Sequence, residues 1–217
     1  MQKLNVLYED NHIIVVVKPN NIPSQADKTG DEDMLTIIKA YIKEKYAKPG
    51  DVYLGLVHRL DRPTGGVMVF ARTSKAAGRL SEQIRNKEIQ KKYIATCDGK
   101  FEKQSDTWKD YLLKNERTNM SKVVSEGTKN AKEAILDYEV ISYNEKTDLS
   151  VVKVNLHTGR HHQIRVQFAS RNHSLFGDQK YGTRGRGKQL RLWAYYLSFK
   201  HPVTKEKMEF ENMPDFI

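Results

Sequence analysis

A carboxylate between two arginines stands out in the segment 58–66, which reads HRLDRPTGG. Arg59 and Arg62 flank Asp61, and a nearby cation keeps a carboxylate ionised even when it is partly desolvated. An ionised, positioned carboxylate can act as a nucleophile or as a general base. Glycines after it would let the backbone approach a ligand closely. Asp61 is therefore a candidate catalytic residue, although a surface turn with Asp61 in a salt bridge would carry the same pattern.

Basic and histidine side chains crowd the segment 157–165, which reads HTGRHHQIR. We expect a helix over 159–171, on which His161, His162 and Arg165 share one face. That face could contact phosphates and supply a guanidinium to a site, or it could be a solvated basic helix. The histidines of this region lack the spacing of a zinc site, and no cysteine lies nearby.

A third segment, Lys91-Lys92-Tyr93, lies at the start of a predicted strand. A tyrosine on a strand is most often a packing residue between neighbouring strands. Its other role in RNA-binding proteins is to stack on a base that has left its helix.

The composition favours a polyanionic partner. The 217 residues carry a formal net charge of +10, and Lys and Arg neutralise phosphates with release of condensed counterions. A single cysteine, Cys97, allows no intrachain disulfide, and a reducing compartment fits. The apolar run Ile13 to Val17 is too short for a signal peptide or a membrane span. We therefore expect a cytoplasmic protein that binds nucleic acid and no membrane.

The elements that must position these segments read as a mixture of strands and helices. Helices are expected over 33–48, closed by Pro49-Gly50, and over 75–85, with Ser74 as N-cap. Predicted strands cover 4–8, 12–18, 66–72, 91–97, 109–113, 134–141, 149–156 and 190–199. The best class is an α+β domain around a mainly antiparallel sheet.

Together the three segments resemble the RluA-type pseudouridine synthases. The family motif HRLDxxTxG stands at 58–66, its KxY motif at 91–93 and its GRxHQIR motif at 159–165. Shorter matches in the family's order extend the resemblance over about residues 4 to 205: Tyr8-Glu9-Asp10, Val17-Lys18-Pro19, Gly177-Asp178, Tyr181-Gly182 and His201-Pro202.

The resemblance implies an RNA pseudouridine synthase, an isomerase that acts on uridines of ribosomal or transfer RNA. The fold it implies is α+β, with a mixed, mainly antiparallel sheet, flanking helices and a central RNA-binding cleft, in one catalytic domain over 1–217. The C1′–N1 glycosidic bond breaks, and the freed uracil rotates and rejoins through C5. No atoms enter or leave, so the resemblance implies neither a cofactor nor a metal.

The resemblance also assigns roles to the site residues. Asp61 would attack C1′ or abstract a sugar proton. Arg165 would pair with Asp61 within about 4 Å, and Tyr93 would stack on the uracil. The candidates for RNA contacts are Arg59, Arg62, Lys91, Lys92, Arg160, His162 and Gln163, with Arg184 and Arg186 as further phosphate contacts.

Three positions depart from the family pattern: Gly65 stands where Ser is usual, and Gln167 and Trp193 stand where His is usual. The chain also begins at the synthase-like strand, so we expect no S4-like RNA-binding domain, and RNA affinity would come from the catalytic domain itself. A monomer is favoured. The rivals are a noncatalytic RNA-binding module of the same fold and a metal-dependent nuclease. The nuclease lacks the clustered carboxylates that magnesium sites use.

Overall fold

The computed structural model describes residues 4–182 and 187–217, which form two compact units. The first unit comprises Met1–Gln90 and Ala194–Pro214, and the second comprises Lys91–Trp193 and Asp215–Ile217. Arg184 and Arg186 lie outside the described residues. Both units combine antiparallel strand pairs with helices, so the predicted α+β class is confirmed.

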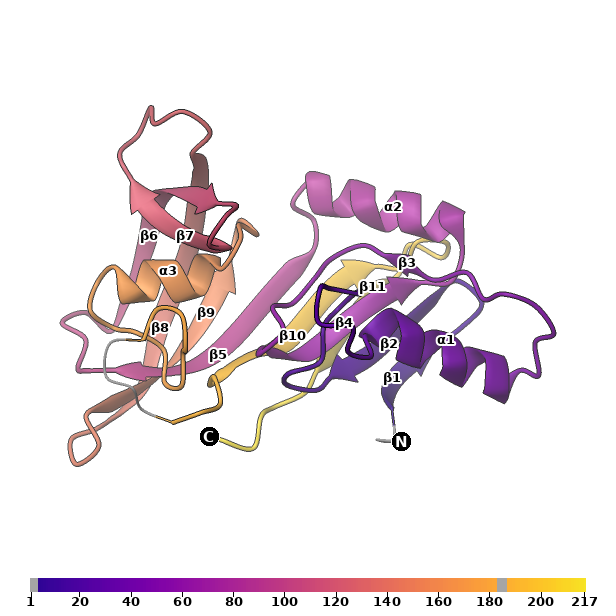
Figure 1. The fold of residues 1–217 in the computed structure, drawn as a ribbon, viewed down its shortest axis with the longest axis horizontal. Helices are drawn as coiled ribbons and strands as arrows, with labels where there is room; N and C mark the ends of the chain where they lie inside the picture. The colour runs from indigo at the N-terminus through magenta and orange to yellow at the C-terminus, as the bar shows by residue number, and fades with distance from the viewer. Residues whose placement is uncertain (1–3, 183–186) are drawn as a thin grey trace. The chain divides into compact units, whose positions relative to one another are not determined.

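The first unit holds two helices and a sheet with strand order β1-β2-β4-β10, where β3 also pairs with β4 and β11 with β10 (Figure 1). The elements are β1 (Asn5–Glu9), β2 (Ile13–Lys18), α1 (Met34–Lys45), β3 (Gly55–Leu56), β4 (Gly65–Ala71), α2 (Ser74–Arg85), β10 (Leu192–Lys200) and β11 (Lys207–Glu211).

The second unit is a sheet with strand order β5-β9-β8-β6-β7 and one short helix. Its elements are β5 (Gln90–Asp98), β6 (Ser105–Asn115), β7 (Met120–Val124), β8 (Lys132–Asn144), β9 (Leu149–Leu156) and α3 (Gln163–Ala169). The predicted strand over 149–156 has these bounds, whereas β6 and β8 are longer than expected. Strands β3, β7 and β11 were not predicted, because they are short or polar.

The first unit buries both faces of its central strands. Every residue of β2 is buried, and so is every residue of β4. Ile13 and Val15 pack with Leu80 of α2 in one cluster, while Ile14 and Val16 point to the other face and are also 0% exposed. Strands covered on both sides are near-continuous apolar runs, which explains the run from Ile13 to Val17 in β2.

Capping side chains fix where the helices of the first unit begin. Asp33 accepts hydrogen bonds from the backbone N–H groups of Leu35 and Thr36, as an N-cap does. The N-cap of α2 is Thr73, whose hydroxyl accepts from the N–H of Ala76. The prediction of Ser74 was wrong by one position, because Thr and Ser are both good caps and the sequence alone does not choose between them.

The helix expected over 159–171 is shorter, and α3 spans Gln163–Ala169 only. His162 adopts a left-handed conformation with φ 53°, which breaks any helix that would come from residue 159. Figure 1 shows α3 lying over the strands of its own unit, and Val166 packs there against Leu112 and Ala134. His161 and His162 thus precede the helix instead of sharing its face with Arg165.

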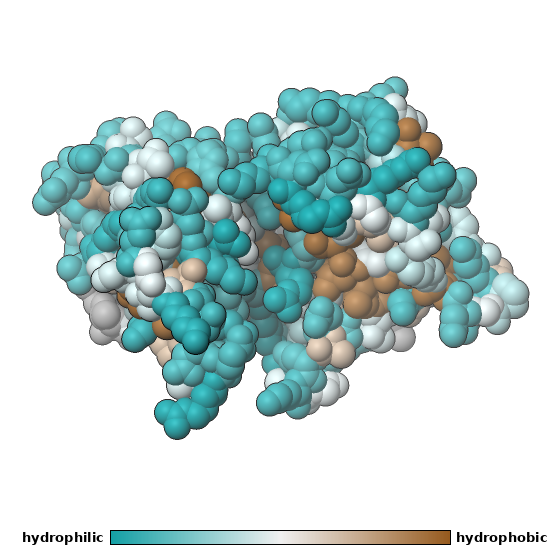
Figure 2. All heavy atoms as spheres, turned by 90° about the horizontal axis from the view of Figure 1, so that it is seen from above, coloured by the Kyte–Doolittle hydropathy of each residue, from teal (hydrophilic) through white to brown (hydrophobic). Residues whose placement is uncertain are grey.

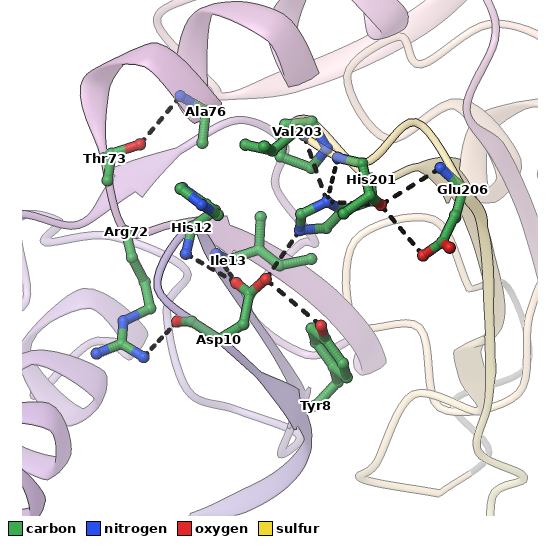
Figure 3. Close-up of polar contacts among 12 residues, drawn as sticks. Tyr8, Asp10, His12, Ile13, Arg72, Thr73, Ala76, His201, Val203 and Glu206 are labelled. Atoms are coloured by element: carbon green, nitrogen blue, oxygen red, sulfur yellow. Dashed lines mark hydrogen bonds and ion pairs between the residues drawn. The ribbon is translucent and has the colours of Figure 1, made fainter.

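A polar network ties the two ends of the first unit's chain together (Figure 3). Asp10 follows β1 and accepts hydrogen bonds from the N–H groups of His12 and Ile13 through Oδ1. Its Oδ2 lies 2.9 Å from Nε2 of His201, which comes directly after β10. The Asp10 pKa is lowered: burial would raise it, but these backbone donors and His201 outweigh burial.

Candidate active site

Asp61 begins a tight turn between Leu60 and β4 in the first unit. The N–H of Thr64 donates to the carbonyl oxygen of Asp61 at 2.9 Å, which closes the turn. Leu60 before it and Thr64 after it are buried, whereas Asp61 itself is half-buried. The turn predicted from Pro63 and the glycines is therefore present, and it holds Asp61 between two buried anchors.

Lys18 holds this turn in place through buried hydrogen bonds. Its side chain is 0% exposed, and its Nζ donates to the carbonyl oxygens of Pro19, Ile22 and Arg62 at 2.9, 2.6 and 3.0 Å. Burial lowers the pKa of Lys18 to about 7, the charge of Asp61 opposes that shift, and the charge of Arg62 adds to it. The end of β2 is thereby fixed to the turn that carries Asp61.

A serine adds a second anchor for the same turn. The hydroxyl of Ser24 donates to the carbonyl oxygen of Leu60 at 2.8 Å and accepts from its N–H at 3.2 Å. Buried groups therefore hold the backbone on both sides of Asp61. Such pre-organisation is what a catalytic carboxylate needs.

The two arginines beside Asp61 differ in their surroundings. Arg62 forms ion pairs with Asp31 and Asp27 and donates to the carbonyl oxygen of Asn21. It therefore ties two loops of the first unit together, and its availability for RNA is reduced. Arg59 is exposed, which suits the predicted contact with RNA.

The structure explains why the second of the two glycines in the motif, Gly66, is a glycine. Its φ is +127°, and a Cβ added there would overlap the backbone carbonyl oxygen of Ala194 in β10. Only glycine adopts this conformation without strain and allows the two strands to approach so closely.

In the second unit, Arg165 is held by a carboxylate of that unit. Its Nε and Nη2 donate to Oδ2 and Oδ1 of Asp178 at 2.8 and 2.6 Å. Arg165 is 4% exposed, and the Asp178 side chain is 0% exposed. Burial alone would raise the pKa of Asp178, but the hydrogen bonds and charge of Arg165 hold it below its usual value. Sequence reasoning did not predict this pair.

Two histidines and a tyrosine surround this pair. The rings of His161 and His162 stack with centroids 3.7 Å apart, and Nδ1 of His162 lies 2.8 Å from the hydroxyl of Tyr181. Burial, with a smaller contribution from Lys114, lowers the pKa of His161 to about 4. Burial and the charge of Arg165 lower the pKa of His162 to about 2. Both rings are therefore neutral near pH 7.

The Lys-Lys-Tyr segment lies on β5 as predicted. Tyr93 is 6% exposed and pairs in register with Val154, while Lys92 pairs with Asn155. Lys91 is half-buried, and its Nζ lies close to Gly159, since a Cβ there would be 3.7 Å away. Burial lowers the pKa of Lys91.

Two of the residues predicted to contact RNA form hydrogen bonds within the second unit. Gln163 is 3% exposed, and its Oε1 accepts from the hydroxyl of Thr158 and the N–H of Arg160. These bonds build the turn that precedes α3. Arg160 is exposed, yet its Nε donates to the carbonyl oxygen of Glu133 at 2.7 Å.

Two residues that the sequence analysis did not assign to the site, Lys18 and Asp178, have recognisable features in the sequence. Lys18 is a single cation at the end of an otherwise apolar strand, and a lysine there must find buried acceptors. Asp178 follows a glycine and lies near a buried arginine, but the separation of 13 positions between Arg165 and Asp178 hides their pairing.

The described residues contain no group of three or more His, Cys, Asp or Glu side chains that could hold a metal ion. Among the helices of the described ranges, none has both the length and the apolar composition needed to cross a membrane. On the face seen in Figure 2, hydrophilic side chains cover most of the surface.

The RNA pseudouridylate synthase family model matches residues 12–170. The chain belongs to this family. An uncharacterised RNA pseudouridine synthase of Aquifex aeolicus is 34% identical over 96% of this chain and 68% of its own length. Ribosomal large subunit pseudouridine synthase C of Buchnera aphidicola is 33% identical over 94% of this chain and 65% of its own. The tRNA pseudouridine synthase C of Haemophilus influenzae is 30% identical over 94% of this chain and 90% of its own length. The chain thus spans about two thirds of the first two relatives.

Solved structures show the same fold. Human RNA pseudouridylate synthase domain containing 4 aligns with a TM-score of 0.81 at 22% identity, covering 98% of this chain and 89% of that one. Human RNA pseudouridylate synthase domain containing 1 aligns with a TM-score of 0.79 at 24% identity, covering 100% of this chain and 85% of that one. These structures confirm the predicted fold, and the family match confirms the predicted enzyme class.

Proposed function

We propose that this protein converts specific uridines of ribosomal or transfer RNA into pseudouridine, with Asp61 as the catalytic carboxylate. The observation that carries the proposal is the family match over residues 12–170, which includes Asp61, Tyr93 and Arg165. The relatives whose names specify a substrate modify ribosomal or transfer RNA, which supports these two RNA classes.

The turn around Asp61 supports its role as the reacting group. Lys18 and Ser24 hold the backbone on either side of it, so the carboxylate can meet a ribose without first being ordered. It would either attack C1′ or remove a sugar proton. Both routes need an ionised carboxylate, which the positive charges of Lys18 and Arg62 favour.

We further propose that Asp61, Tyr93 and Arg165 act at one site within a single catalytic domain. In this proposal the Arg165 guanidinium lies within about 4 Å of the Asp61 carboxylate, and the Tyr93 ring stacks on the flipped uracil. An experimental structure with a bound RNA tests it. A separation above about 8 Å, twice the ion-pair limit, with Asp61 in open solvent would contradict it.

RNA would be held mainly through its phosphates. Arg59 and Arg160 are exposed, and Lys91 and Lys92 are half-buried, so their side chains are the best candidates for phosphate contacts. His162 and Gln163 are buried and suit a supporting role beneath that surface.

We propose that the protein is cytoplasmic, because Cys97 is a buried free thiol, which suits a reducing compartment. We also propose that it is a monomer.

The experiment incubates the purified protein with bulk cellular RNA in buffer with EDTA and then detects pseudouridine. We expect wild type to form pseudouridine and Asp61→Asn to form none, while both bind RNA alike, because the amide is neither a nucleophile nor a base. Asp51→Asn is the matched control, since it neutralises an exposed carboxylate of the same unit. Binding without turnover by wild type would favour the noncatalytic module.

A further inference from the structure

Three segments of the second unit meet around the ring of His161, which comes before α3. Nδ1 of this ring lies 2.9 Å from the hydroxyl of Ser121 in β7, and the N–H of Ser121 donates to the hydroxyl of Tyr181 at 2.8 Å. Beside Tyr181, Lys180 donates through Nζ to the carbonyl oxygen of Asn119 at 2.9 Å. The hairpin of β6 and β7 and the loop that carries Lys180 therefore fix the position of His161.

The His161 ring forms the outer layer of a short stack. The ring of His162 covers one of its faces, with centroids 3.7 Å apart and an angle of 30° between the planes. His162 is 8% exposed, and the hydroxyl of Tyr181 lies 2.8 Å from its Nδ1. His161 itself is half-buried. Because His162 covers one face and Ser121 lies at the Nδ1 edge, the exposed part of the His161 ring is its outer face and its Nε2 edge.

The stack is neutral but lies among cations. Burial, followed by the charges of Lys114 and Lys180, lowers the pKa of His161 to about 4, so the ring carries no charge near pH 7. Glu116 opposes this shift and pairs with Lys114 at 2.6 Å. Lys114 and Lys180 are exposed, and so is Arg117 at the tip of the hairpin. A flat neutral ring beside ammonium groups combines the two features that bind single-stranded RNA, a surface for stacking and charges for the backbone.

A base suits the face of this ring better than a phosphate does. A phosphate beside an imidazole would favour the protonated form, which the lysines beside His161 disfavour. Every base has a face that can stack on an aromatic ring without any charge, and histidine is among the side chains on which unstacked RNA bases pack. The motif GRxHQIR leaves position 161 open, so this ring is a property of the chain and not of the motif.

We propose that His161 is a stacking platform for an unpaired base of the RNA substrate, distinct from the reacting uridine, and that the charges of Lys114 and Lys180 attract the phosphates next to that base. This inference rests on the proposed function, because the RNA that binds here is the substrate of the reaction. The platform selects RNA that presents an unpaired base to the second unit.

The test compares two strands of about ten nucleotides, oligocytidylate and an abasic ribose-phosphate chain of the same length. Cytidine takes the place of uridine so that no isomerisation accompanies binding. We expect wild type to prefer the strand with bases, and His161→Ala to lose at least about fivefold of this preference, the contribution of one stacked base. An equal preference in the two proteins, or a wild type that binds both strands alike or neither, would overturn the proposal.

Two further variants separate stacking from other effects of the change. His157→Ala is the matched control, because it removes an exposed imidazole of the same unit, one that pairs with Asp137 at 2.6 Å, and it should keep the preference. His161→Phe restores an aromatic face without the bond to Ser121, so it should recover most of the preference. A His161→Phe variant as weak as His161→Ala would refute stacking. Thermal unfolding shows which variants are folded, and His161→Gln replaces His161→Ala if the latter is not.

The ring protons of His161 give a direct readout by NMR. A base stacked on the ring moves the Cε1–H and Cδ2–H resonances upfield, so oligocytidylate should move them and the abasic chain should not. Equal movements with both strands would contradict stacking and indicate that phosphates alone bind there. Base-dependent binding through His161 by a wild type that forms no pseudouridine in bulk RNA would refute the proposed function alone. An active enzyme whose preference for bases does not depend on His161 refutes only the platform.

Discussion

The Nζ of Lys18 donates a hydrogen bond to the carbonyl oxygen of Arg62 across 44 positions of sequence, at 3.0 Å. This bond joins the end of β2 to the turn that begins at Asp61. Two further carbonyl oxygens, those of Pro19 and Ile22, complete the surroundings of the buried ammonium. A completely buried residue thus fixes the position of the turn that carries Asp61.

Replacing Lys18 by Met tests this anchor. Met has similar length but donates no hydrogen bond, so three carbonyl oxygens lose their donor and the turn loosens. We expect the isomerisation rate to fall at least about tenfold, because small displacements of a reacting group are costly. Lys39→Met, an exposed position in α1, is the control. An unchanged rate for Lys18→Met would show that the turn holds itself.

The same lysine should make stability depend on pH. Its pKa is lowered in the folded state from 10.5 to about 7, so between these values the unfolded chain binds more protons. The free energy of unfolding therefore rises with pH across this window, and the stability gained at high pH is lost as pH falls through 7. Urea unfolding of wild type and Lys18→Met should show the difference between them growing from about pH 7 to 9, by at most about 1.4 kcal/mol per pH unit. A constant difference would refute the shift.

Gly66→Ala should destabilise the first unit. The backbone has φ +127° and meets Ala194 in β10, so we expect a loss of at least about 2 kcal/mol in the free energy of unfolding. Gly78→Ala is the opposite control, because it lies on α2 and a Cβ there meets nothing within 4 Å. That change should stabilise by about 0.5–1 kcal/mol. Equal effects of the two changes in denaturant unfolding would contradict the close strand contact.

RNA affinity should fall steeply as salt rises, because the net charge is +10 and each phosphate contact releases counterions. In a plot of log affinity against log salt, Lys91→Gln should reduce the slope by about 1. Lys146→Gln, at the exposed turn between β8 and β9, should leave the slope as it is. A wild-type slope near zero would indicate that the site recognises a nucleoside without its phosphates.

The sequence predicted most of the local structure and the order of the motifs, and its failures have identifiable causes. The segment 58–66 reads as a turn because Pro and Gly determine the backbone locally. The start of α3 was misplaced because His162 is left-handed, and nothing in the local residue types marks that conformation. The pairing of Arg165 with Asp178 and the burial of Lys18 depend on tertiary contacts, which periodicity does not contain.

The division of the chain has a consequence for synthesis on the ribosome. The second unit is a continuous run from 91 to 193, apart from residues 215–217, whereas the first unit needs residues 194–214 to complete its sheet with β10 and β11. Strands β1 and β2 therefore wait for β10 and β11 to complete their unit, since Asp10 meets His201 only after residue 201 has emerged. Until then Ile13 and Val15 of β2 lack the cover that Leu197 and Phe199 provide, and nascent chains of this protein should depend on chaperones until β10 and β11 have emerged.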